Sequence, residues 1–89
     1  MNSNVKAHAT IRIPFQDRNY LGIAFKALEP ETFKSTMTRS QTILRKEEAN
    51  LIINIEAQDT IALRATINTY LRLISSILIV YSTLKSLKS

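Results

Sequence analysis

Few side chains in this sequence of 89 residues could carry out chemistry. There is no cysteine and one histidine, so a thiolate metal site is excluded and a Ser/His/Asp triad would depend on His8 alone. The adjacent carboxylates of Glu47 and Glu48 lie in a predicted polar turn, which favours a solubilising role over proton transfer. With Gly22 as its one glycine, the chain has no glycine-rich phosphate loop. We therefore expect no catalytic site, no cofactor and no metal. An enzyme that uses His8 with a carboxylate is the least favoured alternative.

The chain also carries an excess of positive charge. Lys and Arg number 12 against 7 Asp and Glu, a net charge of +5, and no acidic residue follows Asp59. Such a surface can face solvent, an acidic protein partner or RNA phosphates. RNA-binding signatures such as a GxxG loop or an aromatic-rich RNP strand are absent from the sequence. The residues we would expect to meet RNA are Arg12, Arg39, Lys85 and Lys88.

The first half of the chain reads as a strand and a helix. Apolar and polar residues alternate over residues 5–13, which predicts a strand with one polar face. Apolar residues then recur at helical spacing over residues 17–28, with Asp17 as the cap, and Pro30 is expected to end this helix. Gly22 inside the helix indicates either simple tolerance or a close approach of another backbone.

The second half reads as two strands and a long helix. Residues 32–46 have the Thr-rich, β-branched composition of a strand, and a polar turn follows in which Asn50 can adopt positive φ. Alternation over residues 51–57 predicts the third strand, which forms a hairpin with the second. Asp59 then caps one helix over residues 60–86, which contains neither proline nor glycine.

The order β-α-β-β-α restricts the topology. If the sheet is antiparallel, the third strand must lie between the other two, and both helices cover one face. We predict an α+β fold, a half-ferredoxin-like layer structure, in a single domain over residues 1–89. The core is small, because a chain of this length buries only roughly 60–65% of its unfolded surface.

The last helix is too long for its own sheet. It would measure roughly 40 Å, whereas a strand of seven to nine residues covers about 25–30 Å. Its far end carries the unbroken apolar run from Ile77 to Tyr81, which surrounds the whole helix instead of forming one stripe. Either the first helix covers the second side of this run, or another chain does.

No segment of the sequence predicts export or membrane insertion. The polar N-terminus lacks the features of a signal peptide, and the uncharged stretch from Leu73 to Leu84 is shorter than the ~20 residues of a spanning helix. We expect a cytoplasmic protein with no membrane contact.

The junction of the last strand and helix has a recognisable pattern. A strand that ends I-E-A-x-D is followed by a helix with L-R-A-x-x-N-T-Y-L-R, from Ile55 to Arg72. The opening A-T-I-R-I-P-F and the K-A-L-x-P-E of the first helix match as well. The chain thus resembles the small dimerisation subunit of the KEOPS complex, the Pcc/CTAG-antigen family, over nearly its whole length. Thr69 stands where many members have serine, and the turn near Asn50 lacks their frequent glycine.

This resemblance implies a non-catalytic role. KEOPS makes the threonylcarbamoyl modification of adenosine in tRNA, and its Pcc-like subunit dimerises, docks its helices on the catalytic threonylcarbamoyltransferase subunit and assists tRNA binding. The partners implied are a second copy or, as in some archaea, a paralogue, then the catalytic subunit, with weak or indirect tRNA contact. The alternative is a stand-alone basic RNA-binding module. By this resemblance the matched polar motif residues are Arg64, Asn68 and Arg72, and the predicted partner interface comprises Leu21, Phe25, Leu63, Ile67, Tyr70, Ile74, Ile77 and Tyr81.

Overall fold

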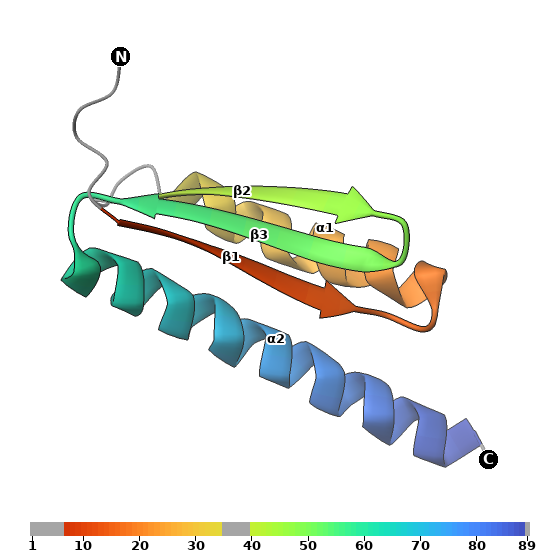
Figure 1. Ribbon diagram of the computed structural model, residues 1–89. Coiled ribbons are helices and arrows are strands. Elements are labelled where there is room, and N and C mark those ends of the chain that lie inside the picture. Colours follow the sequence, from red (N-terminus) through yellow and green to blue (C-terminus); the bar gives the residue numbers. More distant parts are fainter. Residues whose placement is uncertain (1–6, 35–39, 89) are drawn as a thin grey trace.

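Three antiparallel strands and two helices form the chain in the computed structural model, which describes residues 7–34 and 40–88 (Figure 1). The predicted β-α-β-β-α order and α+β class are confirmed. The elements are β1 (Ala7–Pro14), α1 (Arg18–Lys34), β2 (Ser40–Glu47), β3 (Asn50–Ala57) and α2 (Thr60–Lys88).

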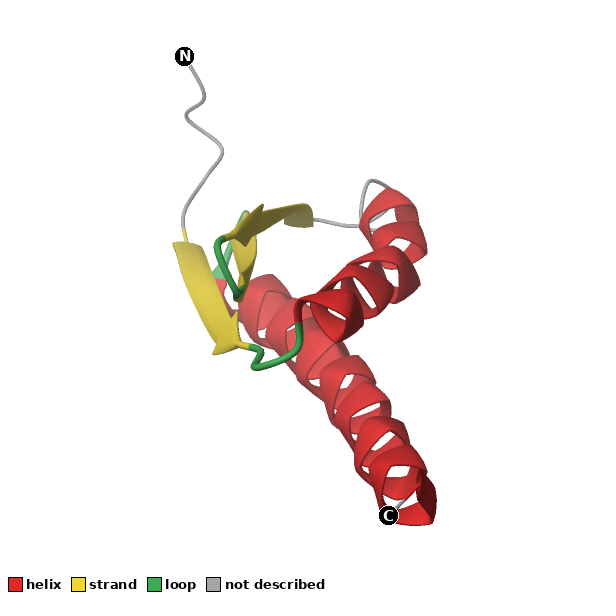
Figure 2. Ribbon diagram, turned by 90° about the vertical axis from the view of Figure 1, so that its right-hand side faces the viewer, coloured by secondary structure: helices red, strands yellow, loops and turns green. Residues whose placement is uncertain are grey.

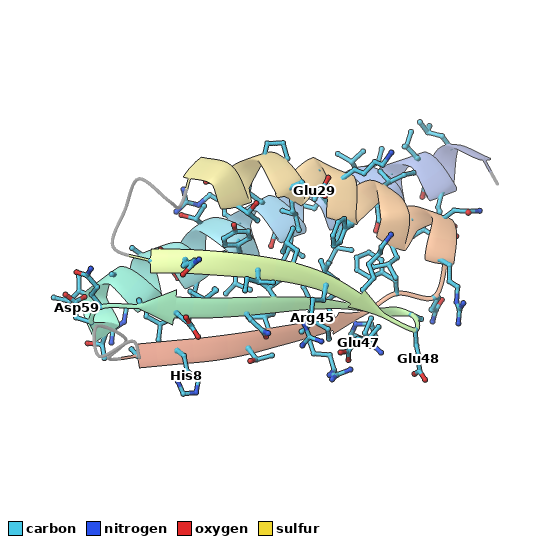
Figure 3. The ribbon with its side chains drawn as sticks, turned by 90° about the horizontal axis from the view of Figure 1, so that it is seen from above. His8, Glu29, Arg45, Glu47, Glu48 and Asp59 are labelled. Atoms are coloured by element: carbon cyan, nitrogen blue, oxygen red, sulfur yellow. The ribbon has the colours of Figure 1, made fainter. Side chains whose placement is uncertain are left out.

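The central strand of the sheet is β3, which pairs antiparallel with both β1 and β2, as predicted. Ile53 is opposite Ile11 on one side and Leu44 on the other, which sets the register of the sheet. Both helices lie on one side of the sheet (Figures 2 and 3). We call the other side the open face; it carries the even-numbered residues of β1 and β3 and the odd-numbered residues of β2.

The hydrophobic core lies between the sheet and the helices. Leu51, Ile53 and Ile55 alternate along β3 and are fully buried, and Leu28 of α1 and Tyr70 of α2 close over them. One side-chain hydrogen bond also ties β2 to α2, between the hydroxyls of Ser40 and Thr66 at 2.6 Å.

Both predicted helix caps are present. The Asp17 carboxylate accepts hydrogen bonds from the backbone N–H groups of Asn19 (2.9 Å) and Tyr20 (3.4 Å). The Asp59 carboxylate accepts one from the Ala62 N–H at 2.7 Å. Each cap satisfies backbone donors that have no partner inside the helix.

The predicted end of the first helix was wrong, because α1 continues through Pro30 to Lys34. Pro30 is exposed, so the helix loses one backbone hydrogen bond without burying an unpaired group. The hydroxyl of Thr32, in the same turn, donates to the carbonyl of Glu29 at 2.7 Å and supports the helix there. Thr32 therefore belongs to α1 and not to the second strand, while the predicted strand positions Thr36 and Thr38 lie outside the described residues.

The hairpin turn also differs from the prediction. Asn50 is already the first residue of β3, opposite Pro14 and Glu47, and the residue with positive φ is Glu48 (57°). The connection is thus a tight turn of two residues, Glu48 and Ala49, and twisted two-residue hairpins favour positive φ at these positions.

The last helix extends beyond its sheet, as predicted. Figure 1 shows the C-terminal end of α2 running past the ends of the strands. The chain is elongated, with extents of 51 × 23 × 18 Å and a radius of gyration of 14.3 Å. A compact chain of this length would have a radius of gyration of about 12 Å.

A candidate docking groove between the two helices

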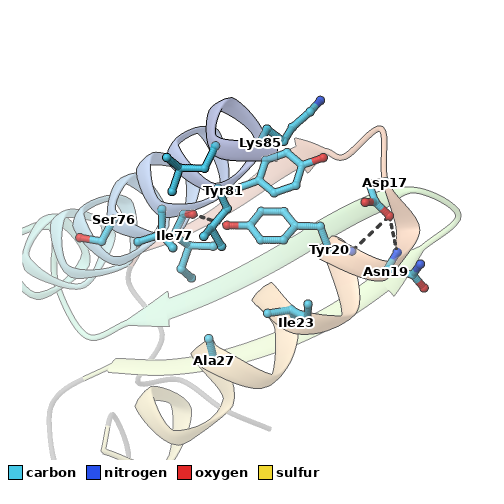
Figure 4. Close-up of a pocket in the computed structure, with 12 residues that line it drawn as sticks. Asp17, Asn19, Tyr20, Ile23, Ala27, Ser76, Ile77, Tyr81 and Lys85 are labelled. Carbon is cyan, nitrogen blue, oxygen red and sulfur yellow. Dashed lines mark hydrogen bonds between the residues drawn. The ribbon is translucent and has the colours of Figure 1, made fainter. Parts of the chain in front are cut away.

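A groove of about 860 Å³ separates the start of α1 from the C-terminal part of α2 (Figure 4). The ring of Tyr20 forms its floor and stacks on the ring of Tyr81, with centroids 3.9 Å apart and planes inclined by 23°. The Tyr20 hydroxyl donates to the backbone carbonyl of Ile77. The groove lining is mostly apolar and comes from both helices: Asp17, Asn19, Tyr20, Ile23 and Ala27 on one side, and Ser76, Ile77, Val80, Tyr81, Leu84, Lys85 and Leu87 on the other.

Local sequence explains why Tyr20 occupies this position. The Asp17 cap fixes the first turn of α1, and Tyr20 lies in that turn. On its other side the ring contacts Phe15, at 5.8 Å between centroids, and the Phe15 N–H donates to the carbonyl of Ala49 at 2.8 Å. The β1–α1 connection is therefore anchored on the hairpin turn, and it holds Tyr20 against α2.

Electrostatics within the groove are simple. Burial raises the pKa of the Tyr20 hydroxyl above its usual value of 10.0, so it is protonated and able to donate at neutral pH. The ammonium of Lys85 lies 5.3 Å from the centroid of the Tyr81 ring, within cation–π range. The groove is thus apolar in its middle, with a basic group on its outer side.

Beyond the groove, α2 exposes a series of apolar side chains. We call residues 78–87 the overhang. The exposed fractions rise from 39% at Leu78 to 55% at Val80 and Leu84, 65% at Ile79 and 76% at Leu87. Water contact with several neighbouring large apolar side chains is unfavourable, and such patches mark interaction surfaces.

Comparison with known proteins identifies the family of this chain. Residues 8–82 match the family model described as transcription factor Pcc1. The chain belongs to the Pcc1 family. That family is the KEOPS subunit family that the strand–helix motif had indicated, and its members are non-catalytic subunits. No individual curated protein matches the chain.

In this Pcc1-family chain the eight predicted interface residues fall into two groups. Leu21, Tyr70 and Ile74 are buried in the core of the chain itself, so they offer no surface to a partner in this structure. The other five pack partly against that core and keep some exposure: Phe25, Leu63, Ile67, Ile77 and Tyr81.

The exposed surface next to these residues was missing from the predicted set. Ile23 of α1 is 60% exposed, and it lines the groove with Val80, Leu84 and Leu87. Helical periodicity separates a buried stripe from the rest, but it does not show which apolar residues lie outside the reach of the sheet. The comparison of helix length with strand length was the signal that located the overhang.

The predicted polar residues do not form one cluster. Arg64, Asn68 and Arg72 lie along α2, with both arginines outside the core. Arg12 lies on the open face, 3.7 Å from Glu47, whereas Lys85 lies on the helix side. Arg39 lies outside the described residues, as does the side chain of Lys88, the last residue of α2.

Within residues 7–34 and 40–88, no three His, Cys, Asp or Glu side chains are grouped to hold a metal ion. His8 is exposed on the open face, on the side of the sheet away from the groove (Figure 3). The groove therefore has the features of a binding surface: apolar area, one buried hydroxyl and a basic group on its outer side.

By length and composition alone, residues 60–87 could also cross a membrane. The best 18-residue window has a mean hydropathy of 1.3, and 11% of it is buried. A core helix of a soluble protein passes the same test of length and composition, although such a helix is mostly buried. In this helix Tyr70 and Ile74 are buried in the core, and Arg64 and Arg72 lie outside it along the same segment.

Proposed function

We propose that this chain is a non-catalytic, dimerising subunit of a cytoplasmic KEOPS complex, which docks on the catalytic subunit and supports threonylcarbamoyl-adenosine modification of tRNA. Membership of the Pcc1 family supports a KEOPS-related role. The observation that carries the docking proposal is the apolar overhang, continuous with the groove between α1 and α2.

The occupant of the groove and overhang is the catalytic subunit. A groove between two helices, with exposed apolar side chains at helical spacing on α2, fits an apolar helical surface. The overhang itself carries Lys85 and no acidic residue, which favours a partner surface with acidic groups at its rim. The catalytic subunit carries out the modification, and this chain positions that subunit.

Substitutions at the overhang test this proposal. The double variant Val80→Asp, Leu84→Asp places two charges on exposed positions, so the fold is retained while an apolar interface would bury unpaired charge. We expect loss of co-purification with the co-expressed catalytic subunit and a fall in threonylcarbamoyl-adenosine in tRNA. Ile61→Asp is the matched control, because Ile61 is 79% exposed at the opposite end of α2.

Two outcomes would contradict the proposal. One is undiminished binding of the catalytic subunit by the double variant. The other is binding of tRNA by the isolated chain with a steep salt dependence and no affinity for the catalytic subunit, which is the behaviour of a stand-alone RNA-binding module. The open face offers little support for that module, since Arg12 and Arg45 both pair with Glu47.

A further inference from the structure

The groove between α1 and α2 is large enough to bind a small molecule. Its volume of about 860 Å³ lies within the range of roughly 300–1,000 Å³ that ligand-binding pockets have. The floor of the groove is held in place, because the Tyr20 ring packs against both Phe15 and Tyr81. The groove is therefore formed before any partner binds, and a ligand can enter it without ordering another segment of the chain.

Most of the surface inside the groove is apolar. The large apolar side chains exposed along it are Ile23, Val80, Leu84 and Leu87. Two polar groups of the lining are engaged within the chain: the Tyr20 hydroxyl donates to the carbonyl of Ile77, and the Asp17 carboxylate accepts N–H groups at the start of α1. A ligand therefore gains most by laying an apolar chain along the groove, because this removes apolar surface of the ligand and of both helices from water.

One end of the groove favours negative charge in its ligand. Among the described residues that line the groove, Lys85 is the one cation, and its ammonium lies 5.3 Å from the centroid of the Tyr81 ring. Asp17 lies toward the same end (Figure 4), where the N–H groups that it accepts offset its charge. No Asp or Glu follows Asp59 in the sequence, so the C-terminal part of α2 has no acidic side chain.

We infer that this groove binds a small amphipathic anion, an alkyl carboxylate of medium chain length, with its alkyl chain over the Tyr20 ring between Ile23 and Val80 and its carboxylate beside Lys85. The charged pair then stays at the solvent-exposed end of the groove, where it avoids the cost of desolvation. A neutral alcohol of the same length keeps only the apolar contact. An alkylammonium of that length is repelled by Lys85.

Such a ligand would regulate docking, and this part of the inference rests on the proposed function. The ligand covers Ile23, Val80 and Leu84, which belong to the surface proposed for the catalytic subunit. The ligand and the catalytic subunit therefore compete. When the ligand is present at ten times its dissociation constant, mass action raises the apparent dissociation constant of the catalytic subunit by about 10-fold.

Titration of the purified full chain with decanoate, below the concentration at which decanoate forms micelles, tests the binding site. In ¹⁵N-labelled protein we expect saturable amide shifts that are confined to residues 17–27 and 76–87. A ligand of this size should have a dissociation constant of about 0.1–1 mM. Decanol should bind about threefold more weakly than decanoate, and decylammonium at least about tenfold more weakly.

Substitutions separate the apolar contact from the charge. Val80→Asp should weaken decanoate binding at least about tenfold, because the new carboxylate lies against the alkyl chain and repels the anion. Ile79→Asp is the matched control, since Ile79 is the adjacent exposed residue of α2 but does not line the groove. Lys85→Gln should lower the affinity for decanoate about threefold and leave that for decanol unchanged, whereas Lys26→Gln on exposed α1 should change neither.

Several results would overturn the binding site. They are the absence of saturable shifts up to about 10 mM decanoate, unchanged binding by Val80→Asp, and equal affinities for decanoate, decanol and decylammonium. Co-sedimentation of the chain with phosphatidylglycerol vesicles, together with no binding of monomeric decanoate, would also overturn it, because the apolar surface would then meet a lipid bilayer and not a small molecule.

Competition is measured separately, with the complex of the wild-type chain and the co-expressed catalytic subunit. Saturating decanoate should displace that subunit, and decylammonium at the same concentration is the control for a detergent effect. An unchanged complex while decanoate occupies the groove would overturn the regulation. Failure of the catalytic subunit to bind the wild-type chain at all would refute the proposed docking, and the competition with it, while the titration of the isolated chain still decides the binding site.

Discussion

Tyr20 is the residue on which the geometry of the groove should depend most. Its side chain is 8% exposed, stacks on Tyr81, contacts Phe15, and donates its hydroxyl proton to the carbonyl of Ile77. These contacts join the first turn of α1 to the part of α2 that leaves the sheet. Replacement of Tyr20 should therefore loosen the C-terminal part of α2 as well as the core.

The expected magnitudes follow from these contacts. Tyr20→Phe keeps the ring and removes one hydrogen bond, which lowers the free energy of unfolding by about 1 kcal/mol. Tyr20→Ala also removes the buried ring and both aromatic contacts, at a cost of about 3–5 kcal/mol. A domain of this length has about 5–10 kcal/mol in total, so Tyr20→Ala should be close to unfolding at 37 °C.

Urea denaturation followed by circular dichroism measures both changes. Ile23→Ala is the control, since Ile23 lines the same groove but is 60% exposed and should cost less than about 0.5 kcal/mol. A loss below about 1 kcal/mol for Tyr20→Ala would show that the ring does not join the helices. Equal losses in the free energy of unfolding for Tyr20→Phe and Tyr20→Ala would show that the ring contacts add nothing to the hydrogen bond of the hydroxyl.

Further predictions concern helix stability and pH. Gly22→Ala should raise the free energy of unfolding by about 0.5–1 kcal/mol, because a Cβ there meets no atom within 4 Å; a lower melting temperature would contradict this. Asp59→Ala should cost about 1 kcal/mol by removing the cap of α2, and an unchanged urea midpoint would show that the cap contributes nothing. Burial raises the pKa of Tyr20 and of Tyr70 above 10.0, so the folded chain binds these protons more tightly than the unfolded chain. The contribution of these two tyrosines to stability should therefore be constant below about pH 10 and fall as pH rises above it, and a melting temperature that increases above about pH 10 would be incompatible with this burial.

Patterns of period two and 3.6 were sufficient to predict the fold. Alternation in β1 and β3 fixed the strands, and the three-strand order followed from antiparallel pairing with helices on one face. Local conformation was less predictable. Proline usually ends a helix, yet Pro30 is tolerated in α1, and Glu48 takes the positive φ expected for Asn50.

The candidate site was predictable in location and not in detail. The excess length of α2 located the overhang, but periodicity grouped buried Tyr70 and Ile74 with partly buried Ile77. The apolar periodicity of a helix gives no information on the twist or the length of the sheet that the helix packs against. The burial of Ile52 on the open face was equally hidden, because its neighbours in the register, Arg12 and Arg45, come from two other strands.

The uninterrupted course of α2 has a mechanical consequence. From Thr60 to Lys88 the helix has neither proline nor glycine, so a single stiff rod of about 43 Å links the sheet to the overhang. Whatever binds the overhang is thereby held at a fixed orientation to the sheet. Insertion of glycines after Ser76 would keep the residues of the overhang but free them from this fixed orientation, because the insertion would also separate Ile77 and Tyr81 from Tyr20.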